Sequence, residues 1–155
     1  MKKLFIALGM IFLVLVVVIA AFIGYAAFTG ATLDKESKAY ADAAVPAITS
    51  SWNEQELLSR ASPEFQKAAG PADVDRLFGW FRTLGRLQKY EGAHGQAVTS
   101  ITPQTGKVIS GHYVAKAVFD AGEAKIEIEL IKHDNVWQIA GFKINSAALV
   151  PRQRQ

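Results

Sequence analysis

The chain has 155 residues, of which 50% are hydrophobic and 20% charged, and it contains no cysteine. The lack of cysteine excludes a disulfide scaffold, a thiolate zinc site, a cysteine nucleophile and a cysteine-linked lipid anchor. The formal net charge is +3, but Lys2 and Lys3 contribute most of it, so no nucleic-acid partner is expected.

The amino-terminal segment has no charged residue between Leu4 and Leu33. Read as a helix, residues 4–27 reach about 36 Å, enough to cross the roughly 30 Å hydrocarbon core of a bilayer. We therefore predict a transmembrane helix over residues 4–27, with the lipid bilayer as its partner, preceded by a cytoplasmic stub at residues 1–3. Because Lys2 and Lys3 precede this segment and the charges behind it nearly cancel, the domain that follows is expected outside the cytoplasm.

A cleaved signal peptide is the main alternative for this segment. Two lysines followed by an apolar run and small residues are also typical of a signal peptide. The apolar region of a signal peptide is usually roughly 7–15 residues long, however, and the run in this chain is longer. The length favours a retained anchor, and cleavage stays open as the alternative.

Several helices are expected after the anchor. Apolar positions with helical spacing predict a helix over residues 32–52, which Pro46 should kink or split. Asn53, with Glu56 three residues later, has the pattern of a helix cap, and so does Ser62 followed by proline and an acidic residue.

The last helix should start at Pro71 and end near Gly85. Its apolar stripe has i, i+3, i+4, i+7 spacing and is expected to face the core; the stripe comprises Val74, Leu77, Phe78, Phe81 and Leu84, broadened by Trp80.

Beyond Gly85 the apolar pattern changes from helical to alternating, which is typical of strands. Four strands are expected, over residues 87–101, 106–119, 124–132 and 136–146. Asp134 and Asn135 suit a tight hairpin, because both residue types tolerate positive φ. Helices followed by an antiparallel meander indicate an α+β fold, with one face of the four-stranded sheet packed on the helices and the other left solvated or free for a partner.

The order of these elements and the carboxy-terminal sequence resemble a known superfamily. Three segments carry the resemblance: the run from Tyr113 to Ala124, the segment Ile128–Lys132 and the aromatic strand Trp137–Phe142. They are similar to small bacterial envelope domains of the cone-shaped α+β superfamily named after nuclear transport factor two. This superfamily includes SnoaL-like and ketosteroid isomerase-like domains. The resemblance implies a curved sheet and a cone-like extracytoplasmic domain over residues 28–149, followed by a polar tail at 150–155. Together with the predicted anchor, the resemblance to bacterial envelope domains leads us to expect a single-pass protein of the bacterial inner membrane.

Enzymes of this superfamily use an acidic base and a hydroxyl donor in the cone. Tyr40, Tyr90 and Tyr113 could donate, and Asp120 or Glu91 could act as the base. Asp120 is better explained by a turn, and Glu91 lies near a bend. The histidines, His94, His112 and His133, have no metal-binding spacing. We therefore expect no catalytic residue, no cofactor and no metal site.

Aromatic and arginine side chains are the best candidates for a pocket or a partner surface. The candidates are Trp80, Phe81, Tyr113, Phe119, Trp137, Phe142, Arg82 and Arg86. Most of the aromatic residues should form the core, although some could line an apolar hollow if the sheet curves. The arginines of the last helix fall mostly on the face opposite Leu77 and Phe81.

Three functional hypotheses follow from these features. The leading one is a non-enzymatic membrane-anchored module that binds another membrane or envelope protein through the sheet or the arginine-bearing helix surface. The second is binding of a small apolar ligand or lipid in the cone, and the third is a SnoaL-like or isomerase-like enzyme.

Overall fold

The computed structural model describes residues 2–149, with the backbone alone described for residues 2–14 and 22–29. These residues form two compact units, one up to Leu33 and one from Asp34 onward. Helix α1 (Lys2–Thr49) runs from the first unit into the second. The predicted transmembrane segment, residues 4–27, lies largely outside the described side chains. Within the part that is described, no helix contains a stretch long and apolar enough to span a bilayer.

Of the predicted kink or split at Pro46, the split was wrong, because α1 continues through this proline to Thr49. Pro46 lies within the last turn of the helix, so its missing N–H removes a single hydrogen bond near the end. The Thr49 hydroxyl donates to the Val45 carbonyl at 2.9 Å, which satisfies another carbonyl of this turn. Ala44, Val45 and Ile48 are at most 1% exposed, and this packing holds the last turns of α1 in place.

Three further helices follow, and the predicted caps are confirmed. Helix α2 (Glu54–Leu58) is capped by the Asn53 side chain, which accepts from the Gln55 amide at 3.0 Å. Helix α3 (Pro63–Ala68) is capped by the Ser62 hydroxyl. Helix α4 (Pro71–Phe81) continues into a short 3-10 turn, η1 (Arg82–Leu84), and Gly85 with φ 79° ends it.

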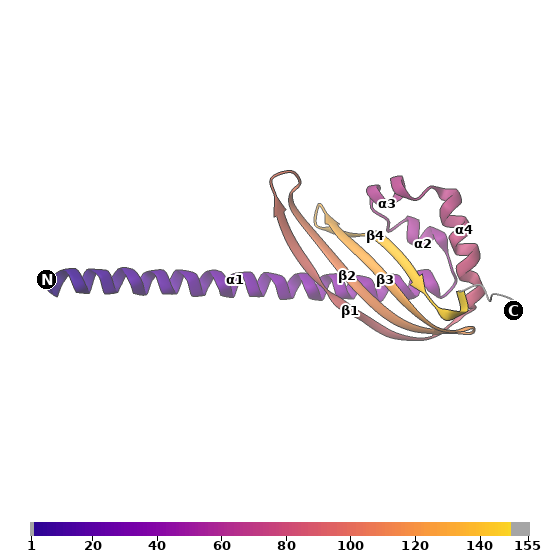
Figure 1. Ribbon diagram of the computed structural model, residues 1–155, viewed down its shortest axis with the longest axis horizontal. Helices are drawn as coiled ribbons and strands as arrows, with labels where there is room; N and C mark the ends of the chain where they lie inside the picture. The colour runs from indigo at the N-terminus through magenta and orange to yellow at the C-terminus, as the bar shows by residue number, and fades with distance from the viewer. Residues whose placement is uncertain (1, 150–155) are drawn as a thin grey trace. The chain divides into compact units, whose positions relative to one another are not determined.

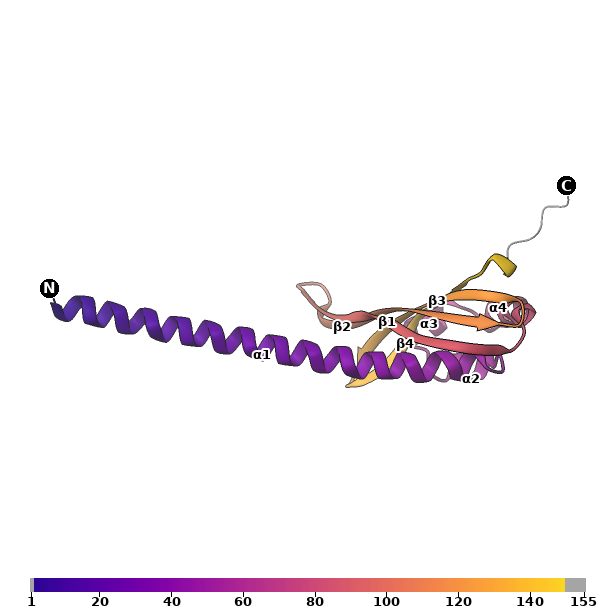
Figure 2. The ribbon, with the colours of Figure 1, turned by 90° about the horizontal axis from the view of Figure 1, so that it is seen from below.

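The four predicted strands are confirmed, and they form one antiparallel sheet in the order β1-β2-β3-β4. Their bounds are β1 (Leu87–Thr102), β2 (Gly106–Phe119), β3 (Gly122–His133) and β4 (Val136–Asn145). The strands curve together (Figure 1). A 3-10 turn, η2 (Ala147–Leu149), follows β4 on the side of the sheet away from α2 (Figure 2). Asp134 and Asn135 have φ of 46° and 68°, as the predicted tight hairpin requires.

The core lies between the helices and one face of the sheet, which we call the inner face. Side chains on this face alternate with exposed ones along β2 and β3, as a half-buried strand requires. The fully buried members include Tyr113, Ala115, Ile126 and Ile128. The opposite face, which we call the outer face, presents the alternating charged side chains, including Lys116, Glu123, Lys125 and Glu129.

Candidate functional site: the outer face of the sheet

The aromatic and arginine residues proposed from the sequence do not form one site. Tyr113, Phe119, Phe81 and Trp137 are between 0% and 7% exposed and belong to the core. Phe119 stacks on Trp52 with ring centroids 5.1 Å apart, and Phe81 lies 6.0 Å from the same ring.

The remaining candidates are more accessible. Phe142 is half-buried, and Arg82 and Arg86 are exposed. Trp80 is 48% exposed and Leu77 is 44% exposed. The predicted placement of these two residues on the core-facing stripe of the last helix was therefore wrong. The buried part of the predicted stripe is Val74, Phe78 and Phe81 on α4 and Leu84 in η1. The side of α4 that carries Leu77 and Trp80 faces away from the core.

Tyrosine and aspartate side chains with possible catalytic roles are engaged in structural hydrogen bonds. Asp120 accepts a hydrogen bond from the Arg86 amide at 2.7 Å and another from the Gln88 side chain at 2.6 Å. These hydrogen bonds lower the pKa of Asp120, the bond from the Arg86 amide having the largest effect, and they outweigh the opposing effect of burial. The Tyr113 hydroxyl lies 2.6 Å from the Ser37 hydroxyl on α1. Each group therefore joins two elements of the fold.

The inner side of the sheet is covered by α1. Ser37, Ala41 and Val45 are each fully buried at 0% exposure, and Ser37 contacts Tyr113 at the centre of β2. Side chains of α1 therefore occupy the space in which the superfamily resemblance implied a pocket.

Carboxylates of α1 close the free edge of β1. Asp42 accepts from the Ala93 amide at 2.7 Å and from the Tyr90 hydroxyl at 2.9 Å. Asp34 accepts from the Ala97 amide at 2.6 Å. An unpaired strand edge is a template for another strand, and these bonds occupy two of the outward amides of β1.

The β4 edge is closed by the segment between α2 and α3. The Ser62 amide donates to the Ile139 carbonyl at 2.8 Å, and the Ile139 amide donates to the Arg60 carbonyl at 2.7 Å. These bonds make a short parallel bridge beside the last strand. Each lateral edge of the sheet therefore carries hydrogen bonds from another part of the same chain over part of its length, and the outer face is the broad accessible surface of the sheet.

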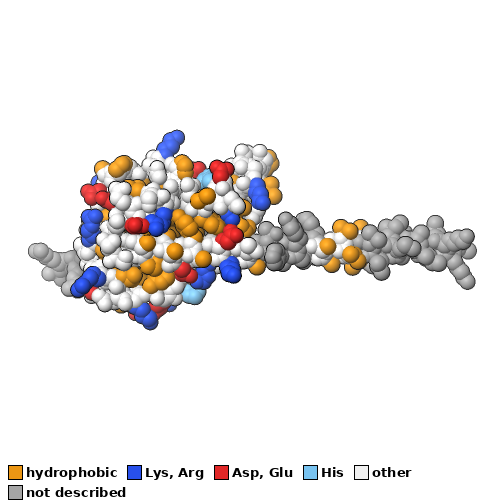
Figure 3. All heavy atoms as spheres, turned by 180° about the vertical axis from the view of Figure 1, so that it is seen from behind, with side chains coloured by type: hydrophobic (Ala, Val, Ile, Leu, Met, Phe, Trp, Pro, Cys, Tyr) orange, Lys and Arg blue, Asp and Glu red, His pale blue; other side chains and the backbone are white. Residues whose placement is uncertain are grey.

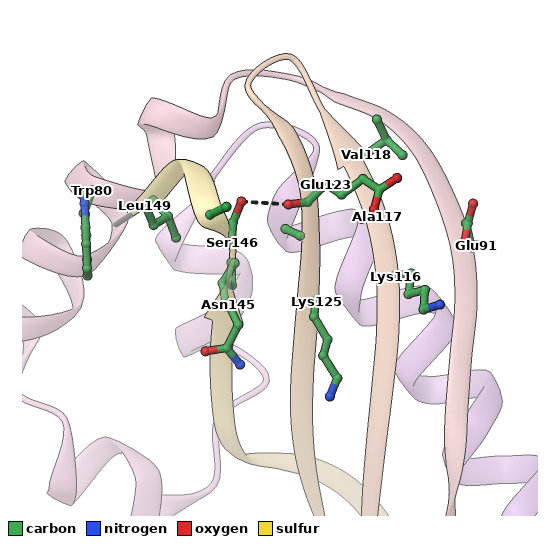
Figure 4. Close-up of a pocket in the computed structure, with 13 residues that line it drawn as sticks. Trp80, Glu91, Lys116, Ala117, Val118, Glu123, Lys125, Asn145, Ser146 and Leu149 are labelled. Atoms are coloured by element: carbon green, nitrogen blue, oxygen red, sulfur yellow. Dashed lines mark hydrogen bonds between the residues drawn. The ribbon is translucent and has the colours of Figure 1, made fainter. Parts of the chain in front are cut away.

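A hollow of about 830 Å³ lies on this outer face, where β2, β3 and β4 approach η2. In Figure 4, Trp80 stands at one end of the hollow and Glu91 at the other, with Lys116 and Lys125 between them. The Ser146 hydroxyl donates to the Glu123 carbonyl at 2.7 Å, which fixes the turn that carries Leu149 beside the hollow. We call this set of residues the Trp80 hollow.

The Trp80 hollow combines an apolar end with a charged floor. Trp80 and Leu149 supply the apolar surface, and Glu91, Lys116 and Lys125 supply charges of both signs. The Glu91 carboxylate accepts a hydrogen bond from the Lys89 ammonium group at 2.8 Å. This hydrogen bond and the positive charge of Lys89 lower the pKa of Glu91. Such a surface suits a polypeptide that brings an apolar side chain and charged groups together.

A second, smaller hollow of about 420 Å³ lies further along the same face. Its lining includes the exposed Val98, the polar side chains of His112 and Glu129, and several small residues; the small residues are Gly95, Ser110, Gly111 and Ala140. The alternation of the strands indicated which charged side chains face outward. The alternation did not predict that the η2 turn after β4 would lie beside these charged side chains, because that contact depends on the fold of the whole domain.

Comparison of the chain with protein-family models, curated proteins and solved structures gives no match.

Proposed function

We propose that this chain is a non-enzymatic, single-pass membrane-anchored module of the bacterial envelope, of the type named after nuclear transport factor two, that binds a partner protein through the Trp80 hollow. The observation that carries this proposal is the distribution of covered surfaces. The helices cover the inner face, Asp34 and Asp42 bond to the β1 edge, and residues 60–62 bond to the β4 edge. The outer face remains for a partner.

The exposed indole of Trp80 supports a protein partner. Tryptophan is enriched among the residues that dominate binding energy at protein interfaces. At 48% exposure, Trp80 leaves a large apolar area in contact with water, and a partner that covers it gains about 25 cal/mol for each Å² removed from water. The lysines and glutamates around it would set the orientation of the partner more than its affinity.

The anchor rests on the apolar run near the amino terminus. Among its described side chains, Leu15 to Ile19 are five consecutive apolar residues between 47% and 59% exposed. An exposed apolar surface of this kind requires a partner or a lipid environment. With Lys2 and Lys3 ahead of it, the run has the charge bias of an anchor whose amino end is cytoplasmic.

The other two hypotheses gain no support from the described residues. Ligand capture in the cone needs space between helices and sheet, whereas α1 packs directly on Tyr113 there. An enzyme of the superfamily type needs an acid that is free to act as a base, whereas Asp120 is bonded to Arg86 and Gln88 in a turn and Glu91 is bonded to Lys89.

Solubilisation of the full chain from membranes in mild detergent tests the binding function. We expect a stoichiometric membrane or envelope protein to co-purify with the wild type, and Trp80→Ala and Lys125→Glu to weaken this association. Val136→Ala is the matched control, because Val136 is also exposed, at 59%, but lies in the β3–β4 hairpin. A wild-type chain that migrates as a bare monomer at all concentrations contradicts the proposal, as does equal loss in the control.

The anchor has its own test. Alkaline extraction should leave the chain in the membrane pellet, and mass spectrometry should find an amino terminus ahead of Leu4. A mature chain that begins near residue 28 would contradict the anchor and leave the binding test unaffected.

A further inference from the structure

The tip of the β1–β2 hairpin carries exposed apolar residues and no acidic ones. Ile101, at the tip, is 77% exposed. Val98, three residues earlier, is 48% exposed on the other face of the strand, where it lines the smaller hollow. No aspartate or glutamate occurs between Gly92 and Phe119, and the tip itself carries Lys107. In Figure 3 the projecting tip shows orange side chains along its outer edge, next to a blue one. An exposed isoleucine beside a lysine, free of acidic neighbours, suits the interface of an anionic bilayer.

The turn at this tip satisfies part of its own hydrogen-bonding capacity. The Thr105 amide donates to the Thr102 hydroxyl at 3.1 Å, and the two threonine hydroxyls lie 2.6 Å apart. Polar groups that are bonded internally lose less when they leave water. The cost of bringing this turn to a lipid headgroup region is correspondingly small.

The direction of the hairpin follows from contacts within the unit that begins at Asp34. The Asp42–Ala93 and Asp34–Ala97 bonds align α1 and β1 in opposite chain directions. Beyond Ala97, β1 continues to Thr102, which adds about 16 Å at the rise of a strand. The tip therefore extends past Asp34 on the side toward which the amino end of this helical segment points.

The length of chain before Asp34 limits how far the unit can stand from the anchor. Asp34 lies seven positions after Ala27, the predicted end of the anchor, and six residues, 28–33, connect the two. This separation is about 10 Å as a helix and at most roughly 24 Å when fully extended. The distance of about 16 Å by which β1 continues beyond Ala97 falls within this range, so the tip is long enough to reach the level of Ala27.

From these observations we propose that the β1–β2 hairpin tip, with Ile101 at its apex, contacts the surface of the bilayer that holds the anchor. This inference rests on the proposed anchor. The contact would fix the orientation of the domain relative to the membrane. The Trp80 hollow lies around the opposite end of β2, so it would face away from the bilayer.

Because the chain has no cysteine, single-cysteine variants give unambiguous labelling. An environment-sensitive fluorophore is attached to Ile101→Cys, to Val16→Cys within the proposed anchor, and to Ala72→Cys on the exposed side of α4. The full-length proteins are reconstituted into vesicles of equal phosphatidylcholine and phosphatidylglycerol. Quenching by nitroxide-labelled phospholipid reports which positions contact lipid.

We expect strong quenching at position 16, and quenching at position 101 severalfold stronger than at position 72. Quenching at 16 with equal, weak quenching at 101 and 72 overturns the hairpin contact while leaving the anchor intact. Equal, strong quenching at 101 and 72 also overturns it, because the whole domain would then lie on the surface. No quenching at position 16 overturns the anchor, and the hairpin contact with it.

Discussion

The carboxylate of Asp42 accepts a hydrogen bond from the backbone amide of Ala93 at 2.7 Å, and the same relationship recurs between Asp34 and Ala97 at 2.6 Å. Eight residues of helix advance about 12 Å, and four residues of strand advance about 13 Å. The two aspartates therefore match the spacing of two outward amides of β1. The match aligns α1 with the strand edge and blocks that edge against pairing with another strand.

Removal of the Asp42 carboxylate should destabilise the domain measurably. Asp42→Ala leaves the Ala93 amide and the Tyr90 hydroxyl without this acceptor, and hydrogen bonds to a charged group contribute about 1.5–3 kcal/mol. The free energy of unfolding of the full chain in detergent, measured with denaturant, should fall by about 2 kcal/mol. Lys38→Ala is the control, because it removes only the exposed ion pair with Asp42 and should cost less than about 0.5 kcal/mol. Equal losses in the two variants would contradict the role of the Ala93 bond.

The pH dependence of stability should report the same carboxylate. Burial opposes ionisation of Asp42, but hydrogen bonds from Lys38, the Ala93 amide and Tyr90 outweigh it and lower the pKa below the ordinary 3.8. A lowered pKa in the folded state gives stability that is present above the unfolded value and is lost as the pH falls through the folded value. Melting temperatures should therefore drop on acidification below about pH 4. Asp42→Asn should show a shallower drop than wild type, whereas Asp75→Asn, at an exposed position of α4, should follow wild type.

Two glycines should respond to alanine in opposite directions. A Cβ built on Gly95 would lie 1.9 Å from the His112 carbonyl oxygen, whereas one built on Gly79 meets nothing within 4 Å. Gly95→Ala must move the β2 backbone and should cost about 2 kcal/mol or more. Gly79→Ala, inside α4, should stabilise by about 0.5–1 kcal/mol, because alanine favours a helix. Thermal unfolding of both variants gives the comparison, and a neutral Gly95→Ala would show that the strands are not this close.

The ion pair between Lys132 and Glu36 should couple α1 to β3. The Lys132 side chain is 8% exposed, and its Nζ lies 2.7 Å from Glu36 Oε2 and 5.4 Å from the centroid of the Trp137 ring. A double-mutant cycle with Lys132→Met and Glu36→Gln should give a coupling energy of about 1 kcal/mol. The exposed pair Arg76–Asp73 is the reference and should give less than about 0.5 kcal/mol. A coupling at Lys132 no larger than at the reference pair argues against this helix–sheet contact.

Much of the α+β fold follows from local sequence signals. Alternation in Ala124–Leu130 and the Asp134–Asn135 turn define the last hairpin, and Asn53 and Ser62 mark helix starts, because each signal acts within a few residues of its own position. The continuity of α1 through Pro46 could not be predicted in the same way, because it depends on the burial of Val45 and Ile48 in the core of the folded domain.

The candidate site was less predictable for the same reason. Helical spacing assigned both Trp80 and Phe81 to the apolar stripe of the last helix. It could not predict that Phe81 would be buried and Trp80 exposed. The bonds from Asp34 and Asp42 to β1 join positions more than fifty residues apart, and no local pattern marks an aspartate as the partner of a strand edge. The outer face became a candidate only once both edges were known to be covered.

Photocrosslinking in intact membranes tests the central claim most directly, that a partner protein binds at the Trp80 hollow. A photoreactive amino acid replaces Trp80 in one variant and Asp75, which is exposed on another side of the same helix, in the other. We predict one discrete crosslinked protein of higher mass from position 80 and little or none from position 75. Crosslinks from position 80 that reach only the chain itself, or that match those from position 75, would contradict the claim.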